Sequence, residues 1–510
     1  MKTKGTVYLV GAGPGDVGLL TLRGAELLRR ADVVVYDAGV NPDVLRLASA
    51  TATQLPIAGG PADAAAPSEA TWQVLVAQAR AGKTVVRLAG GDPYLFGRGS
   101  EEAQRLAEAG VPFEVVPGVS AFAAVPNYAG VPVTGGGQAG RLSLLSDGGG
   151  PSGGEALDWA AEAKLPGTKV VLLDAEPVEQ LAATLLAHGM APDTPVALAR
   201  RGTTGRQQSL EGTLATIGAL ASRNGFAPPT VAVIGDVVKL RPKLNWFEHR
   251  PLFGQRVVVT RARAQAGPLV QQLTELGAQV LELPVIKIVP PTNHEDIVDV
   301  LLGLNGYDWL VFTSPNGVSA FFEMFFKRFQ DLRDIGGVRL AAVGPATAAQ
   351  LRQLHLQVDL MPREALGVQI AREFARFESM ENLRVCLLRA EKAGRDLPQA
   401  LEDLGAIVDD VAVYRTVAET EDPAGAEALL RQNGADWVTF TSGSTVEHFH
   451  ARFNLPELLQ QFPQMRLASL GPETSKTLAA LGLQPAVEAR EHTTEGLVAA
   501  LVRAVRRPVP

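Results

Sequence analysis

Four hydroxyl-rich turns in the second half of the chain have the composition of anion-binding sites. Each follows a short apolar run and precedes a helical pattern; they are Thr-Ser-Pro-Asn at 313–316, Gly-Pro-Ala-Thr at 344–347, Thr-Ser-Gly-Ser at 441–444 and Gly-Pro-Glu-Thr at 471–474. Free N–H groups at helix N-termini favour carboxylates and phosphates. A single turn of this kind is better explained by helix capping, but four matched turns favour a shared anionic ligand.

Glycine-rich turns in the first half indicate a second kind of ligand site. Gly-Ala-Gly-Pro-Gly-Asp at 11–16 follows one apolar run, and Gly-Gly-Asp-Pro at 90–93 follows another. Glycine lets the backbone approach a ligand closely, and an aspartate can accept a bond from a hydroxyl or an ammonium group. The dinucleotide pattern GxGxxG needs glycine where Asp16 stands, which argues against a nicotinamide cofactor.

Short β-type runs alternate with helical patterns along nearly the whole chain. Examples are the runs at 7–10, 32–36, 84–88, 170–173, 257–260, 309–313, 384–389 and 437–441. This alternation predicts α/β architecture. Asp-Trp-Leu-Val-Phe-Thr-Ser at 308–314 recurs as Asp-Trp-Val-Thr-Phe-Thr-Ser at 436–442. The internal repeat predicts two similar α/β lobes in the second half.

Composition restricts the classes of partner and ligand. The 510 residues carry a formal net charge of −7 and no long basic run, which argues against nucleic acid. No apolar run reaches about 18 residues and the N-terminus leads straight into a strand, so we expect no membrane span, no signal peptide and a cytoplasmic location. Cys386 lies in an apolar run and is expected to pack in the core. The histidines lack HExxH spacing, so we expect no metal.

Two stretches interrupt the alternating pattern. A glycine-rich tract at 135–154 is expected to be a flexible loop. A stretch at 241–254 holds two prolines and separates two patterns of different character, so we expect it to be the major linker. The chain is therefore expected to divide into domains at 1–248 and 249–510.

The second domain resembles uroporphyrinogen-III synthase over about residues 254–510. The resemblance is carried, in the family order, by Val-Val-Thr-Arg at 258–261, Val-Phe-Thr-Ser-Pro-Asn-Gly-Val at 311–318, Ala-Val-Gly-Pro-Ala-Thr at 342–347, Val-Tyr-Arg-Thr at 413–416 and Thr-Phe-Thr-Ser at 439–442. It implies lobe one at about 254–288 plus 418–510, and lobe two at about 289–417. The implied reaction closes hydroxymethylbilane with inversion of ring D, and the protein mainly holds the linear tetrapyrrole in the right shape.

The resemblance also implies which residues act in the second domain. Tyr414 matches the tyrosine thought to assist departure of the bilane hydroxyl; a hinge tyrosine that only packs between lobes is the alternative. Substrate-binding candidates are Arg261, Ser314, Thr347, Arg389, Ser442 and Thr474. A two-lobed binding protein without catalysis is the competing class, and formation of the type III isomer separates the two.

The first domain resembles uroporphyrinogen-III C-methyltransferase, within the wider precorrin and diphthine methyltransferase class, over about residues 5–248. The matching segments are 10–16, 35–37, 86–99, 116–121, 129–134 and 212–214. The resemblance implies two α/β lobes with S-adenosylmethionine between them, and a homodimer through this half. It places the methyl donor at Pro14, Gly90, Gly91, Asp92, Leu95, Ser120, Ala121 and Gly202. Asp37 matches the proposed proton acceptor of the family, and Arg98 lies in its catalytic loop.

The first domain also departs from the family pattern at basic positions. Side chains expected to bind a substrate with eight carboxylates are replaced near Ala38, Ala58, Ala89, Gly135 and Gly136. Two interpretations follow: an active, divergent methyltransferase that makes precorrin-2 for sirohaem or cobalamin, or a donor-site relic that serves as a scaffold or regulator. The lost basic groups predict retained donor binding with weak methylation.

Overall fold

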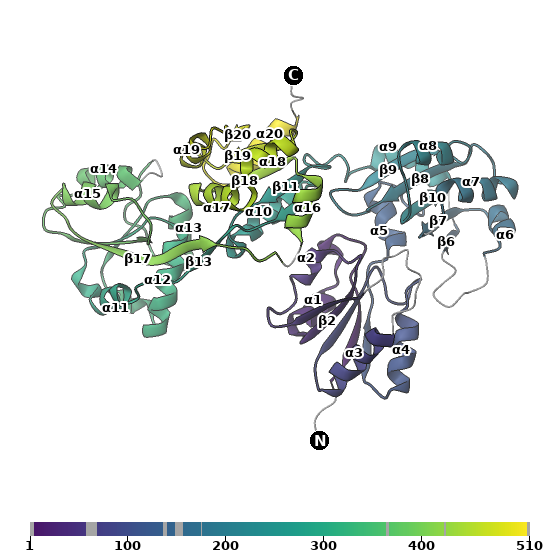
Figure 1. The fold of residues 1–510 in the computed structure, drawn as a ribbon, viewed down its shortest axis with the longest axis horizontal. Coiled ribbons are helices and arrows are strands. Elements are labelled where there is room, and N and C mark those ends of the chain that lie inside the picture. Colours follow the sequence, from purple (N-terminus) through teal and green to yellow (C-terminus); the bar gives the residue numbers. More distant parts are fainter. Residues whose placement is uncertain are drawn as a thin grey trace. The chain divides into compact units, whose positions relative to one another are not determined.

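The structure is a computed structural model that describes residues 5–57, 69–135, 140–147, 157–174, 176–363, 367–422 and 425–506. The chain divides into two compact units, Met1–Val257 with Gln272–Val280, and Val258–Gln271 with Leu281–Pro510. The described residues form four five-stranded sheets with helices between the strands, which confirms the α/β prediction (Figure 1). The domain and lobe boundaries given above stay predictions.

The first sheet is parallel and has the strand order β3-β2-β4-β1-β5. Its elements are β1 (Val7–Gly11), α1 (Leu22–Arg30), β2 (Val33–Asp37), α2 (Pro42–Leu45), β3 (Thr53–Ile57), α3 (Glu69–Arg80), β4 (Val85–Ala89), α4 (Gly99–Glu108) and β5 (Phe113–Val116). Alternating strand residues face opposite sides, so Val10 packs with α1 and α2, whereas Val7 and Leu9 pack with α3 and α4. All five carboxyl ends therefore meet at one edge of the sheet.

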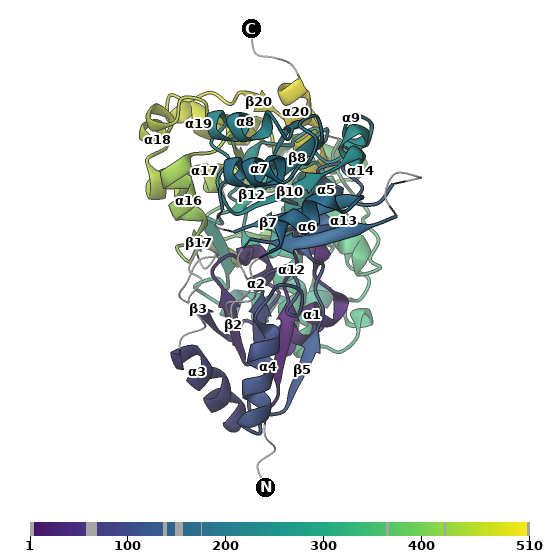
Figure 2. The same cartoon turned by 90° about the vertical axis from the view of Figure 1, so that its right-hand side faces the viewer.

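The second sheet is mixed and has the order β6-β7-β10-β8-β9, with β10 antiparallel to both of its neighbours. Its strands β7, β8 and β10 are labelled in Figure 2. Its elements are α5 (Ala121–Tyr128), β6 (Leu142–Ser146), α6 (Trp159–Lys164), β7 (Thr168–Leu173), α7 (Val178–Ala187), β8 (Pro195–Arg200), β9 (Gln208–Thr213), α8 (Ile217–Arg223) and β10 (Thr230–Ile234). Helices α7 and α8 cover one face, and α5 covers the other.

The third sheet has the order β12-β11-β18-β19-β20. Its elements are β11 (Arg256–Val259), α10 (Arg263–Glu275), β12 (Gln279–Glu282), α16 (Ala426–Asn433), β18 (Trp437–Phe440), α17 (Gly443–Phe453), α18 (Leu455–Gln461), β19 (Arg466–Ser469), α19 (Pro472–Ala480), β20 (Val487–Glu488) and α20 (Thr494–Arg506). Val438 and Phe440 pack against helices α16, α17 and α18 in one buried cluster. Strands β18, β19 and β20 are parallel, so their carboxyl ends lie at one edge.

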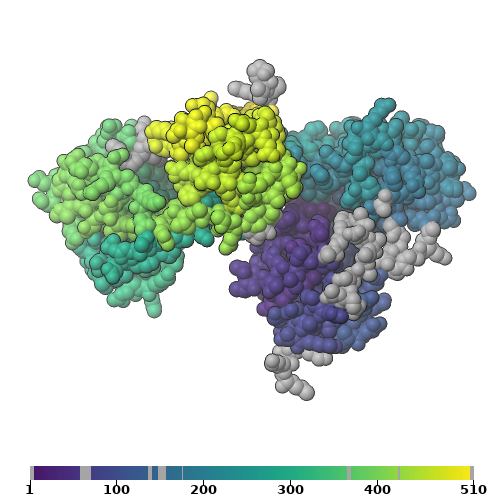
Figure 3. Space-filling model, in the orientation of Figure 1, coloured from purple at the N-terminus to yellow at the C-terminus, as the bar shows by residue number. Residues whose placement is uncertain are grey.

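The fourth sheet has the order β13-β17-β16-β14-β15 and is parallel except for β13. Its elements are β13 (Ile286–Val289), α11 (Glu295–Leu302), β14 (Trp309–Phe312), α12 (Pro315–Arg328), β15 (Arg339–Ala342), α13 (Pro345–Gln353), α14 (Gly367–Phe377), β16 (Arg384–Ala390), α15 (Asp396–Glu402) and β17 (Ile407–Ala418). Cys386 is buried in the cluster that α11, α12 and α13 form with this sheet, as the sequence predicts. Figure 3 shows the same chain with its side chains in space-filling form.

One prediction about a connecting segment is wrong. Within the tract at 135–154, β6 pairs in parallel with β7, so the tract is not an uninterrupted loop; residues 136–139 and 148–154 lie outside the described part. The stretch at 241–254, expected to be the major linker, is ordered in the structure. It begins with the helix α9 (Arg241–Leu244), and Phe247 and Leu252 are buried.

Glu248 shows why the stretch at 241–254 is held in place. Its carboxylate forms an ion pair with Arg241 (2.6 Å) and accepts hydrogen bonds from Gln207 (2.9 Å) and Asn245 (2.9 Å). Buried charges are stable only when paired and hydrogen-bonded, so this network fixes the segment. Among the described residues, no helix is long and apolar enough to cross a membrane.

Candidate functional site

Glycine turns from three parallel strands meet at the carboxyl edge of the first sheet. Gly13 and Gly91 exchange backbone hydrogen bonds of 3.2 and 2.9 Å. A Cβ on Gly118 would lie 2.1 Å from the carbonyl oxygen of Gly91, and one on Gly11 would lie 2.6 Å from the same atom. Because no side chain fits between these backbones, the turns after β1, β4 and β5 require glycine.

Gly90 and Gly91 leave open space beside the backbone. A Cβ built on either residue has no heavy atom within 4 Å, and Gly91 has a φ of 66°, which favours glycine. The residues therefore permit a ligand to approach the backbone after β4, as a methyl-donor site requires. Pro14 lies in the neighbouring turn after β1, and Leu95 lies exposed in the loop that leads to α4.

Other predicted donor residues have structural partners of their own. The Asp92 carboxylate accepts hydrogen bonds from the N–H groups of Tyr94 (2.8 Å) and Gly118 (2.9 Å), so it joins the turns after β4 and β5. Ser120 caps α5, which begins at Ala121. A Cβ on Gly202 would lie 2.5 Å from Val125, so helix packing alone requires glycine there. These contacts shape the turns without excluding contact with a ligand.

An interaction that the sequence did not reveal holds the turn after β1. The N–H of Asp16 donates to Thr203 Oγ1 (3.0 Å), and the Tyr128 hydroxyl donates to Asp16 Oδ2 (2.8 Å). Burial, and then the bond to Asp16, raise the pKa of Tyr128 above its usual value, so the hydroxyl stays a donor. These contacts give a physical reason for aspartate at position 16, where the dinucleotide pattern has glycine. Its partners lie 112 and 187 residues away, beyond any local signal.

The two predicted catalytic residues of this half lie on neighbouring elements. Asp37 ends β2, and its Oδ1 forms an ion pair of 2.7 Å with Arg87, while its Oδ2 accepts the N–H of Gly90 (3.1 Å). Arg98 immediately precedes α4 as its N-cap residue. Arg87 is buried by its own contacts and is not available to a substrate carboxylate. Of the positions that lack the expected basic groups, Ala58 and Gly136 lie outside the described residues.

In the fourth sheet, the Tyr414 hydroxyl lies 3.0 Å from Ser314 Oγ. Ser314 also caps α12 by accepting the N–H of Gly317 (3.1 Å). Tyr414 is mostly buried in the core of this lobe, so it packs and also presents its hydroxyl to a helix N-terminus. The structure thus brings two of the predicted site residues together at the carboxyl end of β14.

Two other predicted residues of this lobe have internal roles. The guanidinium of Arg389 pairs with Asp410 and donates to the carbonyl of Gly394 (2.6 Å). Thr347 is buried in the first turn of α13. Arg389 therefore supports the end of β16, and Thr347 supports the start of α13.

The remaining candidates lie on the third sheet. Arg261 follows β11 and donates to Gln265 (3.1 Å), and Gln265 in turn contacts Asn316 of α12. Burial lowers the pKa of the Arg261 guanidinium, opposed by the charge of Glu495. Ser442 forms a capping box with Thr445 at the start of α17, and Thr474 is buried in the first turn of α19. The four predicted turns thus all begin helices, with Pro at the first helical position of α12, α13 and α19.

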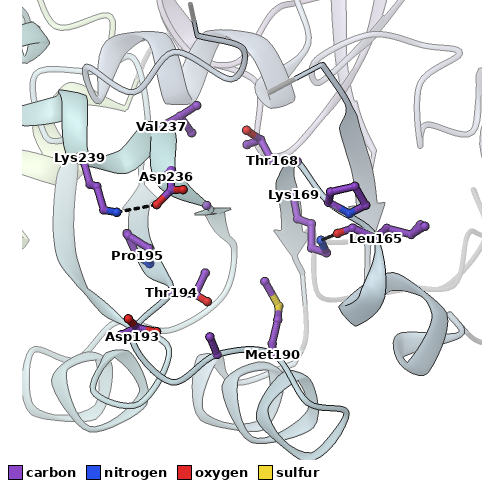
Figure 4. A pocket seen from close by; sticks show the side chains of 14 residues that line it. Leu165, Thr168, Lys169, Met190, Asp193, Thr194, Pro195, Asp236, Val237 and Lys239 are labelled. Carbon is purple, nitrogen blue, oxygen red and sulfur yellow. Dashed lines mark hydrogen bonds and ion pairs between the residues drawn. The ribbon is translucent and has the colours of Figure 1, made fainter. Parts of the chain in front are cut away.

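A cavity of about 350 Å³ lies elsewhere, at the edge of the second sheet where β7 and β8 begin (Figure 4). Lys169 donates to the carbonyl of Leu165 (2.7 Å) on one wall, and Lys239 pairs with Asp236 (2.6 Å) on the other. The loop that holds Gly202 follows the opposite end of β8. None of the predicted site residues lines this cavity, so it is separate from the glycine turns.

The fold and these sites define a chain of two α/β parts, one with a glycine-rich ligand edge and one with helix N-termini suited to anions. Family models match both parts: Tetrapyrrole (Corrin/Porphyrin) Methylases at residues 6–218 and Uroporphyrinogen-III synthase HemD at 267–499. Porphyrin biosynthesis protein HemD of Ruminiclostridium josui is 34% identical over 447 residues, which cover 88% of each chain. The chain therefore belongs to the family of fusions that join a tetrapyrrole methylase to a uroporphyrinogen-III synthase, and its function is bifunctional tetrapyrrole biosynthesis.

Other similar proteins match parts of the chain. Uroporphyrinogen-III C-methyltransferase of Bacillus subtilis is 34% identical over 351 residues, covering 68% of this chain and 71% of that protein. The chain spans about half the length of the siroheme synthases that it matches. The match to the siroheme synthase of Edwardsiella ictaluri covers 52% of that protein. The uroporphyrin-III C-methyl transferase of Thermus thermophilus, solved with S-adenyl homocysteine, is 37% identical to this chain. The match covers 46% of this chain and 99% of that protein, with a TM-score of 0.40.

Proposed function

We propose that the first unit transfers methyl groups from S-adenosylmethionine to uroporphyrinogen III, towards precorrin-2, and that the second closes hydroxymethylbilane to uroporphyrinogen III with inversion of ring D. The observation that carries the proposal is a match of 447 residues, which covers 88% of this chain and therefore runs through both halves. The product of the second half is then the substrate of the first. The match to a C-methyltransferase over 351 residues does not favour the interpretation as an inactive relic.

For methyl transfer, the donor would lie against the open backbone of Gly90 and Gly91. S-adenosylmethionine supplies an electrophilic methyl group when bound. Asp37 stands beside Gly90 and is half-exposed, so its carboxylate can accept the proton that the methylated tetrapyrrole releases. The Arg98 loop would contact the carboxylates of the substrate.

For ring closure, Tyr414 and Ser314 would act on the hydroxyl of hydroxymethylbilane. The Tyr414 hydroxyl would donate a hydrogen bond to the departing oxygen, while Ser314 fixes the direction of that donor. The hydroxyl group leaves with the N–H proton of its own pyrrole ring as water, which gives an azafulvene. The substituted carbon of ring D then attacks the methylene carbon of the azafulvene to form a spiro intermediate. The bond from that ring carbon to its original methylene bridge breaks, and the bridge bonds to the other α-carbon of ring D, which loses its proton. The helix N-termini hold the substrate carboxylates during this step.

Two assays test the halves separately. Incubation with hydroxymethylbilane should give the type III isomer, whereas the type I isomer alone would exclude the synthase. Calorimetry with S-adenosylmethionine should detect donor binding by the full chain. The homodimer and the cytoplasmic location stay predictions; light scattering of the purified protein tests the first.

Changing Tyr414→Phe should slow ring closure about 10- to 100-fold, since a hydrogen bond to the departing group contributes about 1–3 kcal/mol. Tyr307→Phe is the matched control. The Tyr307 hydroxyl also donates a hydrogen bond, to Asp409 on β17 (2.7 Å), away from Ser314. Steady-state formation of uroporphyrinogen III measures both variants. Equal rates for Tyr414→Phe and the wild type would leave Tyr414 with a packing role only.

Changing Tyr128→Phe should weaken donor binding about fivefold, because the lost bond to Asp16 contributes about 1 kcal/mol to holding the turn after β1. The affinity for S-adenosylmethionine, measured by calorimetry, checks this expectation. An unchanged affinity would show that Thr203 alone is enough to hold the turn.

A further inference from the structure

Arg87 carries a buried charge that the proposed reaction does not yet explain. Its side chain, on β4, is 5% exposed. Each of its guanidinium nitrogens has a partner: Nη2 pairs with Asp37 (2.7 Å), Nε with Glu102 (2.8 Å), and Nη1 donates to the carbonyl of Leu88 (2.8 Å). Such a geometry fixes the guanidinium plane within narrow limits.

Glu102 completes the other side of this contact. Its side chain is 3% exposed, in the first turn of α4, and burial raises its pKa while the charge of Arg87 opposes that shift. The N–H of Glu102 donates to the carbonyl of Arg98 (3.0 Å). The Arg87–Glu102 pair therefore ties β4 to the helix turn that begins at the predicted catalytic Arg98.

Asp37 is the exposed end of the same chain of charges. Its side chain is 37% exposed, whereas those of Arg87 and Glu102 are 5% and 3% exposed. One guanidinium shared between two carboxylates leaves a net negative charge on the three groups together. Glu102 is the buried carboxylate of the two. The negative charge is thus presented at Asp37, next to the open backbone of Gly90.

We infer that Arg87 and Glu102 are positioning residues for methyl transfer. They orient the Asp37 carboxylate towards the reacting tetrapyrrole, and they fix the turn at Arg98 relative to that carboxylate. This inference rests on the proposed function of the first unit. A purely structural ion pair would serve stability only and would not need to end on a half-exposed carboxylate. A displacement of about 1 Å at a reacting group can cost roughly a hundredfold in rate.

The double variant Arg87→Met/Glu102→Leu separates the two roles. Replacing a buried ion pair by apolar side chains of similar size is often neutral for stability. Asp37 loses its partner Arg87 in this variant, but its side chain is 37% exposed and can be solvated. We expect kcat for methyl transfer to fall about 10- to 100-fold, with the affinity for S-adenosylmethionine within about twofold of the wild type. Synthase activity of the same chain should be unchanged, and the retained affinity for S-adenosylmethionine reports that the first unit is folded.

Glu102→Gln adds a readout that a structural role would not move. Among the described residues, Arg87 lies between Asp37 and Glu102, and the charge of Arg98 acts on Glu102. Removing the negative charge of Glu102 leaves the Arg87 guanidinium paired with Asp37 alone, so kcat should fall about tenfold while the KM for uroporphyrinogen III stays within about twofold of the wild type. Glu108→Gln is the matched control, since Glu108 is exposed on the same helix.

The outcomes are distinct. Reduced kcat with retained donor affinity and an unchanged KM supports the inference. Wild-type kcat in the double variant, whatever its melting temperature, overturns it and leaves a structural ion pair. A wild-type chain that binds the donor but transfers no methyl group overturns the proposed function, and the inference with it.

Discussion

Changing Asp37→Asn should reduce methyl transfer by about 10²–10⁴-fold, the usual contribution of a positioned general base. Asparagine keeps the size of the side chain and an oxygen that can accept the N–H of Gly90, but it cannot take up a proton. Donor binding should therefore persist. Rates of transfer from labelled S-adenosylmethionine, beside calorimetry with the same compound, measure the two effects.

Asp43→Asn is the matched control for this experiment. Asp43 lies in the first turn of α2 and pairs with Arg46 at 3.1 Å on the surface, so its loss should leave transfer unchanged. Transfer by Asp37→Asn within threefold of the wild type would remove Asp37 from the role of base, whatever happens to binding.

Changing Gly90→Val should abolish donor binding at an unchanged fold. The valine side chain would enter the space beside β4, where a Cβ has no heavy atom within 4 Å, and Gly90 has no positive φ that valine would strain. Occupying the space of the ligand should weaken binding about a hundredfold or more, or about 2.8 kcal/mol. Calorimetry with S-adenosylmethionine measures the loss.

Gly140→Val provides the comparison for Gly90→Val. Gly140 also has open space around a built Cβ and no positive φ, but it lies before β6, away from the turns after β1, β4 and β5. Normal donor binding by Gly90→Val, with both variants folded, would contradict the placement of the donor at this edge.

The alternating strands and the helix starts could be predicted from local sequence because local chemistry determines them. Ser314 and Ser442 cap helices, and Pro345 and Pro472 occupy first helical positions, as the turn composition indicates. The glycines at 90 and 91 were likewise identified as places of backbone approach, and the structure leaves their surroundings open.

Features that depend on partners far apart in the sequence could not be predicted in this way. Arg87 stands in an apolar strand, and its partners Asp37 and Glu102 come from β2 and α4. The stretch at 241–254 has the prolines of a linker, yet Glu248 binds groups that lie about 40 residues before it. Packing of this kind overrides local composition, because buried polar groups must find partners wherever the fold brings them.

Incubating the full chain with hydroxymethylbilane and methyl-labelled S-adenosylmethionine tests the central claim, that one chain performs both reactions, most directly. We predict that the tetrapyrrole product is derived from the type III isomer and carries the label. A product of type I only, or an unlabelled type III product formed while the donor is bound, would contradict the account.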